Sequence, residues 1–314
     1  MKLVNEIIEG NVLVAARLMR GIEDEVPTAV EELKDIYLHT GKAYIVGVAG
    51  APGAGKSTLL DCLIKLFREK NMTVGVIAID PTSPFTGGAI LGDRIRMQSY
   101  GIDKDVFIRS LATRGWKGGL SKATLNMIHI MDAMGKDIIF VESTGSGQAE
   151  TDITQLADSS IVILTPGMGD EIQMMKAGIL EVADIFAINK ADREGAENLK
   201  IYLEVMLGMR DYLPDEWKPS IILTEAISSK GTEELAEEIL KHREFLISSG
   251  ELEKHRKEKA RLELMMAVES SVKNYINDRI NKGCLEKLVD ELVHRKTNPH
   301  SAALKIFNQS ISQL

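Results

Sequence analysis

The 314-residue chain has few cysteines, few aromatic residues and no long apolar run. Its two cysteines, Cys62 and Cys284, are far apart and match no metal-binding or redox spacing, which argues against a disulfide scaffold and favours a reducing compartment. No stretch reaches the roughly 18 apolar residues of a membrane span, and residues 1–19 mix charged with apolar residues, unlike a secretory signal. We therefore expect a cytoplasmic protein without a membrane partner.

The chain also has no excess of positive charge. It carries 38 Lys and Arg against 46 Asp and Glu, so sequence-independent binding to nucleic acid is not expected. The histidines form no close pair, and we interpret each of them as a surface or helix residue rather than a metal ligand. They are His39, His129, His242, His255, His294 and His300. A metallochaperone, which typically needs clustered Cys and His ligands, is therefore a less favoured alternative.

What the chain does contain is ample hydrophobic material, 44% of its residues, in short strand-like runs that alternate with helical patterns. The runs are Tyr44–Ala49, Val74–Ile79, Asp137–Val141, Ser160–Leu164, Ile185–Ile188 and Ser220–Leu223. Helices are predicted between them over Ser57–Lys70, Leu120–Met134 and Gly195–Leu207. Continuous apolar runs are typical of strands buried on both faces, so we predict an α/β fold with a doubly wound, mostly parallel sheet.

Helical patterns without strands flank this region. Residues 1–41 are predicted to form an N-terminal helical extension, with one helix through Met19, a break over Gly21–Pro27 and a second helix over Ala29–Leu38. Residues 251–314 are predicted to form a C-terminal helical region: a charged helix over 251–279 with one apolar face, an interruption at Gly283, then shorter helices over Leu285–Val293 and Ala302–Ile311. The chain thus divides into 1–41, 42–250 and 251–314, and the last part is a second module or an association surface.

The stretch from Gly50 to Ser57 has the P-loop pattern, and it lies between a predicted strand and a predicted helix, as that pattern requires. Glycines allow several backbone N–H groups to converge on phosphate oxygens, and the helix adds its positive end. Lys56 is expected to reach the β- and γ-phosphates, Ser57 to bind Mg²⁺, and Thr58 to lie near the α-phosphate. The predicted phosphate-binding residues are Gly50, Ala51, Pro52, Gly53, Ala54, Gly55, Lys56, Ser57 and Thr58.

A second motif indicates which base is bound. Asn189, Lys190 and Asp192 follow a strand-like run in the order Asn-Lys-Ala-Asp. A carboxylate at this place can accept hydrogen bonds from guanine N1–H and the exocyclic amine, whereas adenine presents no such pair of donors. The alternative is that Asp192 caps the next helix. The Ala226 N–H, after the last predicted strand, could meet guanine O6. We therefore predict GTP and GDP as ligands.

Carboxylates that follow other strands complete the predicted site. Asp80 and Glu142 end strand-like runs, so they should share the ligand-binding edge of the sheet, where they can hold Mg²⁺ directly or through water. Each could instead cap a helix or satisfy a loop, as could Asp93. The Gly145 N–H could contact the γ-phosphate and Gln148 could orient water. The predicted catalytic residues are Lys56, Glu142, Asp93 and Gln148, and the predicted metal ligands are Ser57, Asp80, Asp93 and Glu142.

Taken together, several stretches resemble the MeaB/ArgK-type P-loop GTPases, the bacterial relatives of a methylmalonyl-CoA-mutase accessory protein. The similar stretches are Gly50–Thr58, Ile79–Pro84, Thr86–Met97, Val106–Arg109, Glu142–Glu150, Gly169–Gln173, Lys176–Glu181 and Ala183–Asp192. This sequence departs from the family pattern at Ser143 and Ser146, and at Trp116 and Lys117, where a smaller and less charged pair is more usual.

The resemblance implies a cytoplasmic, homodimeric G protein of the SIMIBI class that dimerises through C-terminal helices. It implies binding to an adenosylcobalamin-dependent acyl-CoA mutase, with GTP hydrolysis gating cofactor loading and protecting the mutase. It also implies that Asp80, Asp93 and Glu142 are the Mg²⁺ and switch carboxylates. The alternative is an ATP-dependent kinase of the kind once assigned to amino-acid transport, which Asn189–Asp192 disfavours.

Overall fold

The computed structural model describes residues 2–24, 26–80, 103–112, 119–143, 145, 153–167, 182–279 and 282–311. The chain forms two compact units, Met1–His255 and Arg256–Leu314. The N-terminal helices therefore belong to the same unit as the central sheet.

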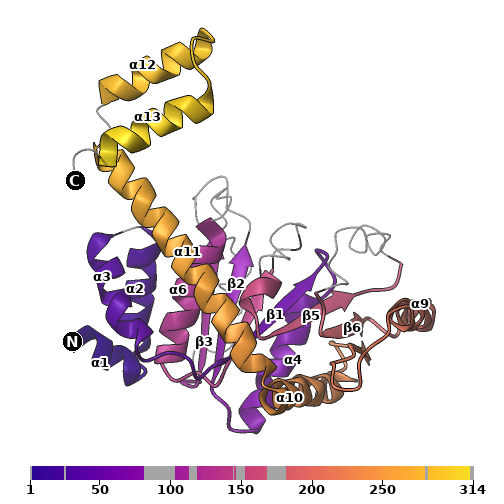
Figure 1. The fold of residues 1–314 in the computed structure, drawn as a ribbon. Coiled ribbons are helices and arrows are strands. Elements are labelled where there is room, and N and C mark those ends of the chain that lie inside the picture. Colours follow the sequence, from indigo (N-terminus) through magenta and orange to yellow (C-terminus); the bar gives the residue numbers. More distant parts are fainter. Residues whose placement is uncertain are drawn as a thin grey trace. The chain divides into compact units, whose positions relative to one another are not determined.

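The first unit is built on a seven-stranded sheet in which every pair of neighbouring strands is parallel (Figure 1). The strands are β1 (Tyr44–Gly50), β2 (Val74–Asp80), β3 (Val106–Ala112), β4 (Ile138–Glu142), β5 (Ser159–Leu164), β6 (Ile185–Asn189) and β7 (Ser220–Thr224), and their order is β3-β2-β4-β1-β5-β6-β7. The predicted doubly wound sheet is confirmed, and each of the six predicted strands is found to within one residue at either end.

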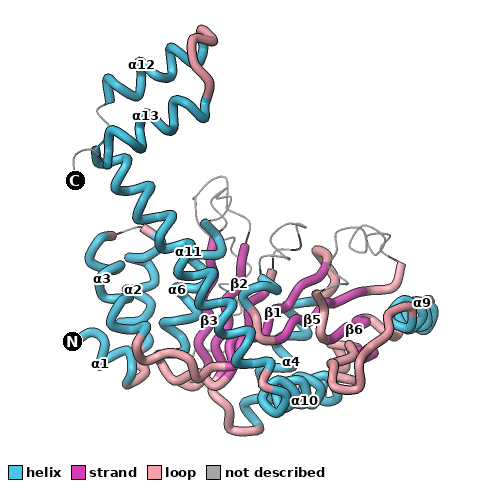
Figure 2. Tube along the Cα trace, viewed as in Figure 1, coloured by secondary structure: helices cyan, strands magenta, loops and turns pink. Residues whose placement is uncertain are grey.

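Helices cover both faces of this sheet (Figure 2). Alternate residues of β1 show this division, because Tyr44, Val46 and Val48 belong to the apolar cluster of α4 (Lys56–Glu69) and α10 (Thr232–Ser249). Ile45 belongs instead to a cluster with α1 (Lys2–Ile8), α2 (Val12–Glu23), α3 (Pro27–Tyr37) and α6 (Gly119–Ala133). A third cluster joins β5 and β6 to α9 (Ala196–Gly208). Burial on both faces explains why the strands are continuous apolar runs.

The N-terminal helices break at a different place from the one predicted. One helix through Met19 was expected, followed by a break over Gly21–Pro27, but α1 ends at Ile8 and α2 runs through Gly21 to Glu23. Gly10 has a φ of +81°, which favours glycine, and the Asn11 side chain accepts hydrogen bonds from the N–H groups of Leu13 (3.2 Å) and Val14 (3.3 Å). The cap at Asn11 thus separates two helices whose apolar spacing is nearly continuous.

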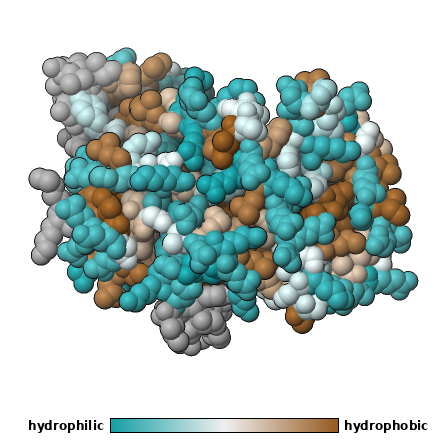
Figure 3. All heavy atoms as spheres, turned by 90° about the horizontal axis from the view of Figure 1, so that it is seen from below, coloured by the Kyte–Doolittle hydropathy of each residue, from teal (hydrophilic) through white to brown (hydrophobic). Residues whose placement is uncertain are grey.

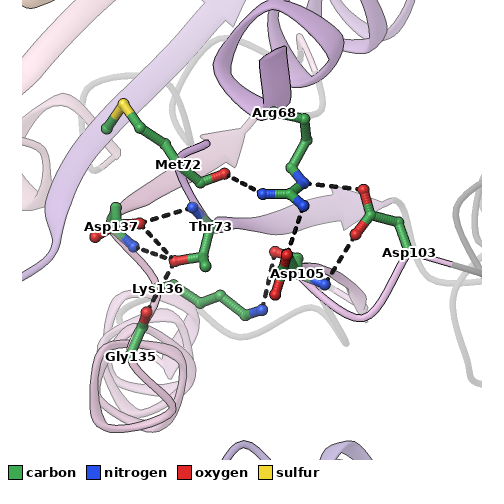
Figure 4. Close-up of polar contacts among 8 residues, drawn as sticks. All are labelled: Arg68, Met72, Thr73, Asp103, Asp105, Gly135, Lys136 and Asp137. Carbon is green, nitrogen blue, oxygen red and sulfur yellow. Dashed lines mark hydrogen bonds and ion pairs between the residues drawn. The ribbon is translucent and has the colours of Figure 1, made fainter. Parts of the chain in front are cut away.

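β3 is the strand that sequence reasoning missed, and a polar cluster fixes the loop before it (Figure 4). Arg68, at the end of α4, donates to Asp103 (2.9 Å), to Asp105 (2.5 Å) and to the Met72 carbonyl (2.8 Å). Lys136, just before β4, donates to the Asp105 carbonyl (3.0 Å). These contacts join the amino ends of β2, β3 and β4, at the edge of the sheet opposite the P-loop. The cation of Arg68 also holds the pKa of Asp103 below its usual range.

A second polar cluster is buried where α10 crosses the amino ends of β1 and β5. The Ser159 hydroxyl contacts both the Tyr44 hydroxyl and His242 Nδ1, and His242 Nε2 lies 3.7 Å from an Asp184 carboxylate oxygen. His242, which was predicted to be a surface or helix residue, lies in a helix but is only 1% exposed. The indole ring of Trp217 lies 4.6 Å from its imidazole. Ser159 is fully buried, so this Ser-His-Asp arrangement has no access for a substrate.

The second unit is helical, with most of α11 (Glu251–Arg279), α12 (Lys282–Val293) and α13 (Pro299–Ile311). Gly283 lies inside α12 rather than between two helices, contrary to the prediction. α11 keeps several apolar side chains between 38% and 63% exposed: Leu262, Leu264, Met265, Val268 and Val272. Among the described helices, none has the length and apolarity needed to cross a membrane.

On the face seen in Figure 3, polar residues predominate and apolar residues lie in separate groups. α9 exposes Ile201, Tyr202 and Val205, and Met209 just after it is also exposed, between 48% and 79%.

Candidate nucleotide-binding site

The predicted site lies at the carboxyl edge of the sheet. Because the strands are parallel, β1, β2, β4, β6 and β7 end at the same edge (Figure 1). β1 lies between β4 and β5, with β2 and β3 on one side and β6 and β7 on the other. Such a switch point is where open α/β sheets bind ligands, and here it is the strand that leads into the P-loop.

The P-loop connects β1 to α4 through Ala51–Gly55. Gly55 has a φ of +91°, and a Cβ there would collide with the Asn189 side-chain nitrogen. The position therefore requires glycine for two reasons, backbone conformation and space. Lys56 is 7% exposed, and its ammonium donates to the carbonyls of Gly50 (2.7 Å) and Ala51 (3.1 Å). The Lys56 cation is thus already held at the loop that would receive the phosphates.

Ser57 and Glu142 come together across the sheet edge. The Ser57 hydroxyl donates to a Glu142 carboxylate oxygen at 2.5 Å, although 85 residues separate them. Glu142 is the last residue of β4 and is 5% exposed. A hydroxyl and a buried carboxylate form an oxygen donor set of the kind that Mg²⁺ prefers. The described residues of this chain therefore fit a magnesium site beside the P-loop.

The other predicted residues of the hydrolytic side are placed only in part. Asp80 is the last residue of β2 and pairs with Ala112 in register, so its backbone lies at the same sheet edge. Gly145 lies against the P-loop, since a Cβ there would be 2.7 Å from the Pro52 nitrogen and 2.9 Å from the Gly50 oxygen. Asp93 and Gln148 lie outside the described residues.

On the base side, the Asn189–Asp192 motif begins at the last residue of β6. Asn189 is 2% exposed, and its amide nitrogen donates to the Ala54 carbonyl (2.8 Å). The Lys190 ammonium donates to the Gly53 carbonyl (2.7 Å), and Asp192 is exposed in the turn that follows. The motif therefore braces the P-loop while leaving the Asp192 carboxylate open to a ligand.

The end of β7 and the loop after it also contact the Asn189–Asp192 motif. The Ala226 N–H, predicted to meet guanine O6, donates to the Asn189 side-chain oxygen at 3.1 Å. The Ala226 carbonyl accepts a hydrogen bond from the Cys62 thiol of α4 at 3.2 Å. Thr224 also reaches the Asn189 oxygen, at 3.4 Å. Sequence reasoning considered Cys62 only for disulfide and metal spacing, and no local pattern marks its pairing with a residue 164 positions away.

Comparison with known proteins identifies the family. A family profile described as "Methylmalonyl Co-A mutase-associated GTPase MeaB" matches residues 15–281. The chain belongs to the MeaB family. It is 46% identical to a protein named as a GTPase in Pyrococcus abyssi, over 98% of this chain and 97% of the relative. It is 32% identical to the GTPase ArgK of Escherichia coli, over 87% and 85% of the two chains. The predicted resemblance is thus confirmed.

The fold is also found among solved structures. A crystal structure described as a LAO/AO transport system kinase superposes with a TM-score of 0.71 over 98% of this chain and 96% of that chain, at 24% identity. Membership of the MeaB family makes the chain a P-loop GTPase that binds guanine nucleotides, as the P-loop and the Asn189–Asp192 motif predicted. Of the predicted site residues, Lys56, Ser57, Glu142 and Asn189 lie together at one edge of its sheet.

Proposed function

We propose that this GTPase acts on a partner enzyme, an adenosylcobalamin-dependent acyl-CoA mutase of the methylmalonyl-CoA mutase type. GTP binding and hydrolysis would gate cofactor loading and protect the mutase. The observation that carries this proposal is the match of residues 15–281 to a family named for its association with that mutase. A mouse relative, 34% identical over 66% of this chain, is named as a methylmalonic aciduria type A homolog.

The hydrolytic roles follow from charge and position. Lys56 would bind the β- and γ-phosphates, and Mg²⁺, when bound, would neutralise charge on the same oxygens. Ser57 and Glu142, already 2.5 Å apart, would hold the metal, together with Asp80 at the end of β2 and with Asp93. Glu142 and Asp93, with Gln148, would position the attacking water. Gly145 would bind the γ-phosphate through its N–H.

The C-terminal helices would supply the dimer. We propose the division of the chain into an N-terminal helical extension (1–41), a GTPase domain (42–250) and a dimerisation region (251–314). The exposed apolar side chains of α11 support this role, because a lone helix in water gains nothing from exposing them. The same proposal places the protein in the cytoplasm, where the mutase and its cofactor would be loaded.

The test uses the full chain and a purified adenosylcobalamin-dependent methylmalonyl-CoA mutase. We expect size-exclusion chromatography to show a complex whose stability differs between GDP and a non-hydrolysable GTP analogue, and mutase addition to change the GTP turnover rate. Lys56→Ala should lower turnover by at least about 100-fold, since it removes the cation that stabilises the transferring phosphoryl group.

Lys65→Ala is the matched control, because Lys65 lies exposed on the same helix. It should leave turnover unchanged. Absence of a complex in both nucleotide states, together with a turnover rate indifferent to the mutase, would refute the proposed partner.

A further inference from the structure

Two residues from other elements hold the loop after β7, and both form hydrogen bonds with the backbone of Ala226. Asn189, at the end of β6, accepts the Ala226 N–H at 3.1 Å. Cys62, on the helix that begins with Lys56, donates its thiol proton to the Ala226 carbonyl at 3.2 Å. Ala226 itself is 6% exposed. The Ala226 N–H is therefore held by the base motif, and the Ala226 carbonyl is held by the helix that follows the P-loop.

Fixing the Ala226 carbonyl also fixes the next N–H. The carbonyl of one residue and the N–H of the following residue share a planar trans peptide and point in opposite directions. Because the Ala226 carbonyl points toward Cys62 on α4, the Ile227 N–H must point away from that helix. Within the part of the chain that the structure describes, no hydrogen bond from the Ile227 N–H is found. This group is therefore one donor that the loop leaves for a ligand.

Hydrogen bonds and an ion pair also hold the rest of this loop in place, so the loop itself does not rotate the Ala226–Ile227 peptide. The Glu225 N–H donates to the Lys230 carbonyl (2.9 Å), and the Ser228 N–H donates to the Glu225 carbonyl (3.1 Å). The Glu225 carboxylate accepts from Ser228 Oγ (2.8 Å) and lies 3.0 Å from the Lys230 ammonium. Ile227 stands out from this frame with its side chain 95% exposed.

We propose that Cys62 is a positioning residue for guanine recognition: it orients the Ala226–Ile227 peptide so that the Ile227 N–H meets the O6 oxygen of the base. This proposal rests on the guanine binding by the loop after β7. It assigns O6 to a different donor from Ala226, whose N–H is taken by Asn189. It also links base choice to the helix that carries Lys56 and Ser57.

The test compares nucleotides that differ at the base edge. Inosine triphosphate keeps O6 and N1–H and lacks the exocyclic amine, whereas 2-aminopurine riboside triphosphate keeps the amine and lacks both O6 and N1–H. With Cys62→Ala we expect KM for GTP and for inosine triphosphate to rise by the same factor, about threefold to fivefold, because a weak hydrogen bond is lost. KM for the 2-aminopurine nucleotide should not change, and kcat for GTP should not change.

Two further variants sharpen the result. Cys62→Ser retains a donor at the same place and should restore KM for GTP. Lys65→Ala, on the exposed side of the same helix, should alter none of the three KM values. An equal rise for all three nucleotides in Cys62→Ala, or unchanged KM for GTP, overturns the positioning role.

The same measurements also show whether the protein recognises guanine at all, which is a separate question from the role of Cys62. If it does not, the unmodified protein itself would not prefer GTP over the 2-aminopurine nucleotide. A preference that is present in the unmodified protein and unaltered in Cys62→Ala refutes only the role of Cys62.

Discussion

At the scale of single residues, the predicted base site combines a side chain that contacts the protein with one that is exposed. Asn189 is buried, and its amide nitrogen and oxygen both contact protein groups, so its described contacts are with the P-loop and the loop after β7. Asp192, three residues later, is exposed. A buried bracing residue and an exposed carboxylate suit a pocket in which the carboxylate alone reads the guanine donors.

This division of roles gives a prediction for Asp192→Asn. A carboxylate can accept two hydrogen bonds from guanine, whereas an asparagine amide also donates and would match the C2 oxygen of xanthine. We expect the ratio of GTP to xanthosine triphosphate affinity to fall by at least about 100-fold. Competition binding of the two nucleotides measures this ratio.

The control is Asp215→Asn, which alters an exposed carboxylate outside the motif and should keep the GTP preference. If Asp192→Asn retains the preference for GTP as well, Asp192 does not select the base.

Motifs that are contiguous in sequence were predictable, and contacts between distant residues were not. The P-loop and Asn189–Asp192 are short patterns whose spacing itself carries the chemistry. The bond from Asn189 to Ala54 joins residues 135 positions apart, and the bond from Cys62 to Ala226 joins residues 164 positions apart. Such pairs become visible only when the strand order is known, because it is the sheet that brings β6 and β7 beside the P-loop.

At the scale of elements, β3 shows why one strand escaped prediction. Its sequence, Val106–Ala112, is interrupted by Arg109 and Ser110, so it lacks the continuous apolar run of its neighbours. β3 lies at the edge of the sheet, where a charged residue is tolerated. The guanidinium of Arg109 finds a partner outside the sheet, the Glu23 carboxylate of α2, at 2.6 Å. The ion pair with Glu23 thus accommodates a charged residue in β3, and the local sequence pattern gives no sign of this contact.

The packing of α10 on the sheet makes stability depend on pH through His242. Burial, with a smaller contribution from the charge of His255, lowers the pKa of His242 from 6.5 to about 4. As pH falls, the unfolded state therefore binds a proton at His242 before the folded state does. The contribution of His242 to the free energy of unfolding is thus fully present above about pH 6.5 and is lost as pH falls toward 4. The full loss corresponds to about 3 kcal/mol in the free energy of unfolding.

The neighbouring Asp184 acts in the opposite sense. Burial raises the pKa of Asp184 from 3.8 to about 7. Its contribution to the free energy of unfolding is therefore present at low pH and is lost as pH rises through about 7. Its side chain is 30% exposed, so solvent weakens this effect. The two residues therefore oppose each other between about pH 4 and 6.5, and a measurement must separate them.

Comparison with His242→Gln isolates the histidine. We expect the free energy of unfolding of the unmodified protein, minus that of His242→Gln, to fall by about 3 kcal/mol between pH 7 and pH 4, because only the unmodified protein carries the buried imidazole. Urea unfolding across this pH range measures the difference. His39→Gln, which alters an exposed histidine, should show no such trend. A difference that is constant with pH would mean that His242 is not buried in its neutral form.

At the scale of the whole molecule, the two compact units differ in the apolar core that the structure describes for each. The first encloses the three apolar clusters on its sheet, whereas α11, α12 and α13 leave large apolar side chains exposed along much of their length. On α11, Leu264, Val268 and Val272 recur every four residues and so lie along one side of the helix. A second copy of the same helices would cover such a row, as the proposed dimer requires.

This proposal predicts the oligomeric state of two variants. A chain that ends after His255 keeps Leu252, which packs against the core of the first unit, and loses the whole second unit. The full-length chain with Leu264→Glu and Val268→Glu keeps all its helices but places charge on the apolar row. Light scattering should give a dimer for the unmodified protein and a monomer for both variants, since burying unpaired carboxylates at an interface is unfavourable. Both variants should still bind GTP, because the P-loop and Asn189–Asp192 lie in the first unit. A dimer that persists in the shortened chain would place the association surface on the first unit instead.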